Sequence, residues 1–343
     1  MNKKVLVFYR LRLRSDIIKN ARNVCIDYLK LFFAIQVVAL HTSPFSEYSS
    51  VLSYLGSQTI SRLAVPYFSA ISGYYFFNNN SNTKYIKSIK KYILMYSVWS
   101  VLMFLYEAVN WKKDALSFFV YAIKVYLFEG WHQLWYLLAI IYTIILIFIV
   151  KEILKISEVL ISYLSILLLM IGISISNYGN LFLSFPILNK LIQCDRNMTV
   201  GWIFIVIPFF MLGKTINDHC NNSIDTKVVV CQMGLCLIGL ELEILITTIL
   251  NLHNNVVLCL FTCPCIYCLI KWAISDPFYQ KQKSGRYCSR MSSMIYYGHY
   301  VLTMILFSFG VSPTKTFIFT LVVTLVLGNC IISSNNSLLK KII

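Results

Sequence analysis

NVCIDYLKLFFAIQVVALH, residues 23–41, is an apolar stretch that also contains Asp27, Lys30 and His41. A helix that spans a bilayer needs roughly 20 mostly apolar residues, and this stretch supplies them. A basic arm precedes it, as in a signal peptide, but no small-x-small cleavage site follows. We therefore expect a retained membrane helix.

Comparable apolar stretches recur along the whole chain. Of its 343 residues 58% are hydrophobic and only 13% are charged, which is too little polar surface to cover a soluble globule. The sequence predicts an all-α polytopic membrane protein with about ten transmembrane helices. The predicted spans are 24–42, 60–77, 92–110, 132–150, 157–176, 200–213, 228–250, 255–273, 291–309 and 315–333.

The distribution of cations predicts the orientation of these spans. With both termini in the cytoplasm, 23 of the 30 Lys and Arg residues fall in cytoplasmic segments, as the positive-inside rule requires. We expect one domain over 1–343 in the cell inner (plasma) membrane, with a basic N-terminal arm at 1–23 and a short tail at 334–343. The apolar stretch 115–128 is a candidate half-buried or interfacial helix.

The net charge of +16 could suggest nucleic-acid binding, and the 11 cysteines could suggest a metal site. The positions of these residues argue against both. The cations lie in short tracts between apolar spans, where topology and anionic membrane lipids explain them better than nucleic acid does. The closest cysteines, Cys263 and Cys265, fall on nearly opposite faces of a helix, which suits a metal badly. We expect no metal site and no nucleic-acid partner.

Ionisable side chains at membrane depth mark candidate functional sites, because they are costly there. Eleven helical steps place Lys30 and His41 about 20° apart around the helix and about 16 Å apart along it. Asp27 precedes Lys30 in an i,i+3 relation and can pair with it. The alternative is that Lys30 reaches the headgroups, Asp27 only neutralises it and His41 is an interfacial residue.

Two further charged positions have their own alternatives. Arg62 directly precedes VPYFSAISGYYFF, where Pro66 and Gly73 can open the helix backbone toward a cavity, or Arg62 is an outer-interface anchor. Glu241 and Glu243 are about 200° apart around their helix, so at least one should point into the bundle. Either carboxylate can serve only as an interhelical hydrogen-bond partner.

Two more histidines lie in aromatic surroundings. Tyr296, His299 and Thr303 share one helix stripe, and His299 is a candidate for catalysis or for a structural hydrogen bond. His132 lies in GWHQLWYLLAII, which also contains Trp135 and Tyr136. An aromatic belt at the membrane interface explains most of that run, and substrate binding is the alternative.

Four of these segments, in order, resemble the acyltransferase family 3 membrane proteins. The hallmark of that family is Arg or Lys, ten residues and then His, which Lys30 and His41 fit. Arg62 with VPYFSAISGYYFF, LWYLLAII after His132, and MIYYGHYVL near the end are also similar to the family. Lys30 stands for the commoner Arg and lacks its bidentate geometry toward phosphate.

The resemblance implies transfer of an acetyl group from cytoplasmic acetyl-CoA, a co-substrate, to a hydroxyl of an envelope glycan or glycolipid. It makes His41 the catalytic base or acyl carrier, since imidazole suits proton transfer near neutral pH. Lys30 and Arg62 then supply positive charge for the CoA phosphates or the thioester oxygen.

We expect membrane lipids as partners, no bound cofactor and no attached soluble module of the esterase-like or racemase type. The expected catalytic residues are His41, Glu241 and His299, and the expected substrate-binding residues are Asp27, Lys30, Arg62, His132, Trp135 and Tyr136.

Two other functions fit the same residues. In a transporter or flippase for an envelope lipid or sugar, the buried ionisable groups line a path and acetyl-CoA is not used. In a non-catalytic partner of envelope enzymes, the polar residues only fix helix packing.

Overall fold

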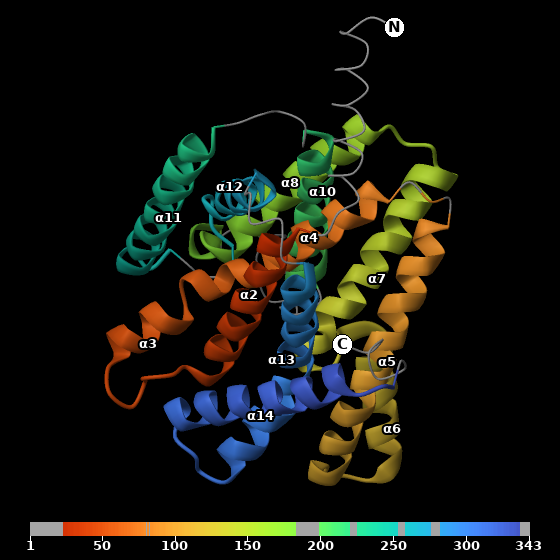
Figure 1. Ribbon diagram of the computed structural model, residues 1–343, viewed down its shortest axis with the longest axis vertical. Coiled ribbons are helices and arrows are strands. Elements are labelled where there is room, and N and C mark those ends of the chain that lie inside the picture. The colour runs from red at the N-terminus through yellow and green to blue at the C-terminus, as the bar shows by residue number, and fades with distance from the viewer. Residues whose placement is uncertain are drawn as a thin grey trace, which may run out of the picture.

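The computed structural model describes residues 23–79, 81, 83–182, 199–219, 225–252, 258–275 and 282–336. Within these ranges every regular element is helical, as the sequence predicts, and Figure 1 shows the helices gathered in one bundle. Residues 1–22 of the predicted basic arm and 337–343 of the predicted tail lie outside the described residues.

The main helices are α2 (Val24–Thr42), α3 (Ser50–Ser57), α4 (Ala64–Asn78), α5 (Lys84–Asn110), α6 (Ala115–Lys124), α7 (Trp135–Phe148), α8 (Glu158–Ser176), α10 (Ile207–Asp218), α11 (Thr226–Ile249), α12 (Thr262–Ser275), α13 (Gln282–Ser308) and α14 (Pro313–Ser333). Short 3₁₀ or π-helical turns connect or extend them: η1 (Ile60–Leu63), η2 (Val125–Glu129), η3 (His132–Leu134), η4 (Ile149–Ile153), η5 (Gly179–Phe182) and η6 (Thr199–Val206).

Among the described residues, six helical segments are long and apolar enough to cross a membrane. They are Val24–Thr42, Lys84–Asn110, Ala115–Ile153, Glu158–Ser176, Thr226–Ile249 and Pro313–Ser333. Each contains or closely matches a predicted span, so the chain is a multi-pass membrane protein. The count of ten spans and the cytoplasmic termini stay predictions.

Helix α2 begins and ends where its sequence supplies caps. The side chain of Asn23 accepts a hydrogen bond from the Ile26 amide at 3.0 Å. At the other end Ser43 adopts a left-handed conformation with φ of 46°, and its amide donates to the Ala39 carbonyl at 2.9 Å. His41 is thereby held in the last turn of α2.

Helices α2 and α13 pack against each other at the centre of the bundle, with α11 and α5 toward its opposite edges (Figure 1). Their close approach depends on Gly285, where a Cβ would stand 3.1 Å from Asp27 Oδ2. The Tyr67 hydroxyl of α4 donates to the Ile26 carbonyl of α2 at 3.0 Å. The position of α2 is therefore fixed from two sides.

Helix α4 differs from the sequence-based expectation for Pro66 and Gly73. It continues unbroken from Ala64 to Asn78, and Pro66 lies in its first turn, where no intrahelical donor is needed. Gly73 lies directly against the Phe210 carbonyl of α10, so that a Cβ would overlap it. Neither residue opens the helix backbone, and Gly73 allows close packing of α4 on α10.

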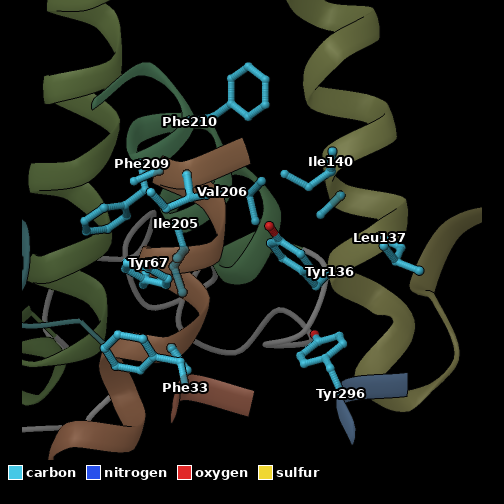
Figure 2. Packing of buried hydrophobic residues seen from close by; sticks show 14 of the residues in the cluster. Phe33, Tyr67, Tyr136, Leu137, Ile140, Ile205, Val206, Phe209, Phe210 and Tyr296 are labelled. Atoms are coloured by element: carbon cyan, nitrogen blue, oxygen red, sulfur yellow. The ribbon is translucent and has the colours of Figure 1, made fainter. Parts of the chain in front are cut away.

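Buried aromatic and aliphatic side chains fill the centre of the bundle. Figure 2 shows Phe33 beside Tyr67, and Tyr136 beside Tyr296. The ring centroids of Phe33 and Tyr67 are 4.7 Å apart and those of Tyr136 and Tyr296 are 6.0 Å apart. Helices α2, α4, α7 and α13 thus share one core, which fixes the positions of their polar side chains relative to one another.

Candidate active site

Two histidines from opposite ends of the chain meet between α2 and α13. The ring centroids of His41 and His299 are 5.3 Å apart, and that of Tyr300 lies 5.9 Å from His41. His41 is exposed, whereas His299 is fully buried. One imidazole is thus open to an incoming molecule and the other lies behind it.

The hydrogen bonds of His299 indicate which ring nitrogen is available. Its Nδ1 lies 2.8 Å from the Tyr296 carbonyl and 3.1 Å from the Ile295 carbonyl. A carbonyl only accepts, so Nδ1 carries the proton. Its Nε2 is buried and has no partner among the described residues. A neutral His299 therefore presents an acceptor nitrogen beside His41.

A third histidine joins this pair through Tyr300. The rings of His132 and Tyr300 stack with centroids 4.2 Å apart. His132 Nε2 lies 2.6 Å from Glu107 Oε1 of α5. The backbone of His132 has a φ of 38°, a left-handed conformation that costs of order 1 kcal/mol and that persists at functional sites. The side chains of α2, α5, η3 and α13 together form a histidine cluster: His41, His132, His299, Tyr300 and Glu107.

Reciprocal hydrogen bonds fasten the His132 turn to α13. Gln133 Nε2 donates to the Tyr297 carbonyl at 2.9 Å, and the Tyr296 hydroxyl donates to the Gln133 carbonyl at 2.9 Å. Because His299 is on the same helix, these bonds fix the spacing between His132 and His299. The strained backbone of His132 is supported in this way.

A cavity of about 690 Å³ opens near the other end of α2. Lys30, Lys91 and Arg286 bring positive charge to its lining, and Asp27 brings a carboxylate. The predicted ion pair between Asp27 and Lys30 is confirmed at 3.1 Å. Five serine hydroxyls add to the polar part of the lining: Ser72, Ser88, Ser289, Ser292 and Ser293. The cavity suits a long ligand with an anionic end.

Three aromatic rings stand between this cavity and the histidine cluster. Phe68, Tyr136 and Tyr296 all line the cavity, and their ring centroids lie between 5.6 and 6.3 Å from one another. Tyr296 is also 6.3 Å from the ring of His299. This aromatic cluster therefore touches both regions, and Figure 2 shows two of its members, Tyr136 and Tyr296, beside each other.

Comparison with known proteins identifies the family of this chain. The acyltransferase domain family matches residues 23–333, which is nearly the whole chain. The chain belongs to the acyltransferase 3 family. Two proteins of Enterococcus faecalis, each named amino-acid racemase, are also similar. One is 27% identical over 258 residues, which is 71% of this chain and 36% of that protein. The other is 30% identical over 211 residues, 60% of this chain and 29% of that protein.

The chain thus spans only about a third of the length of these relatives. No solved structure matches it. The family is described as an acyltransferase domain, and the six apolar helical segments are those of a multi-pass membrane protein. The histidine cluster and the cationic cavity are the two regions in which most of the predicted site residues gather.

The structure also places the remaining predicted site residues. Arg62 is close enough to His41 to act on it electrostatically, and its guanidinium donates to Gln58 Oε1 at 2.7 Å. Tyr136 lines the cavity, whereas the ring of Trp135 packs against Gly201 of η6. The fold thus brings most of the predicted binding residues to the cavity or the histidine cluster.

The two glutamates of α11 have different surroundings. Glu243 is buried and accepts hydrogen bonds from Asn177 and Tyr178 and from the amides of Leu260 and Phe261, at 2.8 to 3.2 Å. This carboxylate ties α11 to the start of α12. Glu241 is half-buried and interacts electrostatically with Tyr54 of α3. Of the predicted catalytic residues, the structure brings together His41 and His299.

Sequence reasoning missed three charged residues of these two regions. Glu107 is the single acidic residue of the predicted span 92–110, so the rule for ionisable groups at membrane depth was enough to find it. Lys91 and Arg286 carry no such signal, because a cation near the end of a span also follows from the positive-inside rule. Only their position beside the cavity distinguishes them.

Proposed function

We propose that this acyltransferase of the inner membrane moves an acetyl group from acetyl-CoA to a hydroxyl of an envelope glycan or glycolipid. One observation carries the proposal: α2 and α13 present a cationic cavity near one end and a pair of histidines near the other, with an aromatic cluster between them. Such an arrangement suits a donor and an acceptor that approach from opposite sides.

The donor fits the cavity by its charge and length. Lys30, Lys91 and Arg286 offer ammonium and guanidinium groups for the phosphates of CoA. The serine hydroxyls along the wall can bind the amides of the pantetheine arm. The thioester then points toward Phe68, Tyr136 and Tyr296. The Lys30 end faces the cytoplasm in this proposal, where acetyl-CoA is available.

The histidines supply the proton transfer. As a general base, His41 takes the proton of the acceptor hydroxyl while the oxygen attacks the thioester carbonyl. The carbon–sulfur bond breaks, and CoA leaves as a thiolate that receives the proton from His41. As an acyl carrier, His41 attacks the carbonyl first and releases the same thiolate, and the acceptor hydroxyl then displaces the imidazole. His299 Nε2 can accept a hydrogen bond from a protonated His41 in either route.

The test is binding and slow hydrolysis of acetyl-CoA by the purified protein in detergent. Wild type should bind and hydrolyse it, His41→Ala should bind without hydrolysis, and Lys30→Ala should bind weakly. His219→Ala is the matched control, since His219 lies at the end of α10 and hydrogen bonds to Thr215 of its own helix. Absence of any interaction in well-folded wild type would overturn the proposal and favour a transporter.

A further inference from the structure

A second hollow lies on the outer side of α5, where α6 and η2 pack against it. Its volume is about 520 Å³, within the range of about 300–1,000 Å³ that is usual for ligand sites. The rings of Phe104 and Phe118 join α5 to α6, with centroids 5.0 Å apart. We call this hollow the α5–α6 groove, lined by Ser100, Phe104, Ala122, Ile123, Leu127 and Trp131 among others.

The chemistry of the α5–α6 groove indicates a hydrocarbon occupant. The residues that the structure describes around it carry no charge and are mostly apolar. Both α5 and the segment Ala115–Ile153 belong to the candidate membrane spans. Ile123 and Leu127, which line the groove, are also exposed on the outer face of the helices. The groove is therefore accessible from the lipid and suits an acyl or polyprenyl chain.

The α5–α6 groove lies next to the histidine cluster. Ser100, Phe104 and Glu107 follow one face of α5 at i, i+4 and i+7, so the carboxylate that holds His132 lies about one helical turn beyond the groove lining. Trp131 lines the groove and directly precedes His132. Its buried Nε1 has no partner among the described residues, which leaves a donor for the polar end of a ligand.

We propose that the α5–α6 groove binds the hydrocarbon chain of the acceptor, which is a lipid with a hydroxyl in its headgroup. The inference rests on the proposed acyl transfer and names the class of its acceptor. The chain lies against Phe104 and Leu127, and the headgroup reaches Glu107 and His132. From there a hydroxyl comes next to His41, to which His132 is connected by the ring of Tyr300.

Photolabelling in bilayers tests this proposal. The probe is phosphatidylglycerol with a diazirine on one acyl chain, and labelled peptides are identified by mass spectrometry. We expect peptide 115–131 of wild type to be labelled several-fold more than the lipid-exposed helix α11. Ala122→Phe should lower that labelling about tenfold, because Ala122 is buried at the groove wall. Val120→Phe is the matched control, since Val120 is 62% exposed on the same helix and does not line the groove.

A second groove-filling variant and a lipid-competition measurement make the outcome decisive. Ile123→Trp fills the groove from its exposed rim and replaces Ala122→Phe if that variant does not fold. Unlabelled phosphatidylglycerol should compete better than phosphatidylcholine, which lacks a headgroup hydroxyl, and Glu107→Gln should weaken this preference. Labelling of 115–131 that equals α11, that survives both filling variants, or that shows no headgroup preference would mean bulk lipid only and would overturn the proposal. Failure of wild type to bind acetyl-CoA would instead refute the proposed function, because labelling needs no donor.

Discussion

The two ends of the α2–α13 pair hold their polar groups in different ways. Near Lys30, long side chains face an open cavity, and both Lys91 and Arg286 are exposed. Near His41, each neighbouring imidazole is held by a defined contact: His132 by Glu107 and His299 by a backbone carbonyl. The difference fits the proposed roles, in which one end recognises the charge of the donor and the other sets the position of individual atoms, as bond-making steps require.

Removal of His41 should have the largest effect. It should lower acetyl transfer at the histidine end without changing donor binding at the Lys30 end. His41→Ala should lower acetyl transfer about 10²–10⁴-fold, the usual contribution of a general acid–base group. Binding of acetyl-CoA, measured by calorimetric titration of both proteins, should stay within about twofold, because His41 does not line the cavity. Loss of donor binding in folded His41→Ala would show that the two ends are a single site.

Removal of a cavity cation should affect binding more than catalysis. Arg286→Ala should raise KM for acetyl-CoA about tenfold, since one charge-assisted hydrogen bond contributes about 1.5 kcal/mol. The value of kcat should change little. Lys113→Ala, an exposed cation between α5 and α6, is the control and should leave both constants unchanged. A fall in kcat with unchanged KM for Arg286→Ala would contradict a role in donor binding.

Replacement of the carboxylate beside His132 should show whether the Glu107–His132 contact contributes to kcat. Glu107→Gln keeps the shape but removes the charge that holds His132 Nε2 at 2.6 Å. We expect kcat to fall about fivefold, in line with about 1 kcal/mol for one hydrogen bond, and KM for acetyl-CoA to stay constant. An unchanged kcat in steady-state kinetics would show that His132 does not contribute to the chemistry.

The smallest expected effect is that of changing Tyr296, which lies between the cationic cavity and the histidine cluster. Tyr296→Phe removes the hydrogen bond to the Gln133 carbonyl and should lower kcat about threefold, since the His132 turn is held less firmly. Tyr136→Phe is the matched control: it removes the contact of the same aromatic cluster with Ser72 Oγ and leaves the turn in place. Equal losses in both variants would assign the effect to the cluster as a whole.

Local pattern predicts much of the fold and part of the candidate site. The apolar stretches predict the six candidate spans, and the i,i+3 spacing predicts the Asp27–Lys30 ion pair, because both depend on residues near each other in sequence. The account of Gly73 was wrong for a physical reason: a small residue in a helix suits an opening and a close helix contact equally well. Only the neighbouring carbonyl of Phe210 distinguishes them.

The sequence by itself determined that this chain is a helical membrane protein and that Lys30 and His41 share a helix face about 16 Å apart along its axis, because helical periodicity is a local property. Only the tertiary structure decided that His41 meets His299, that Glu107 holds His132, and that Arg286 joins Lys30 at one cavity. These contacts connect residues far apart in the chain. They form because α13 packs against α2 and η3 is fastened to α13, and that packing depends on the shape of the whole core.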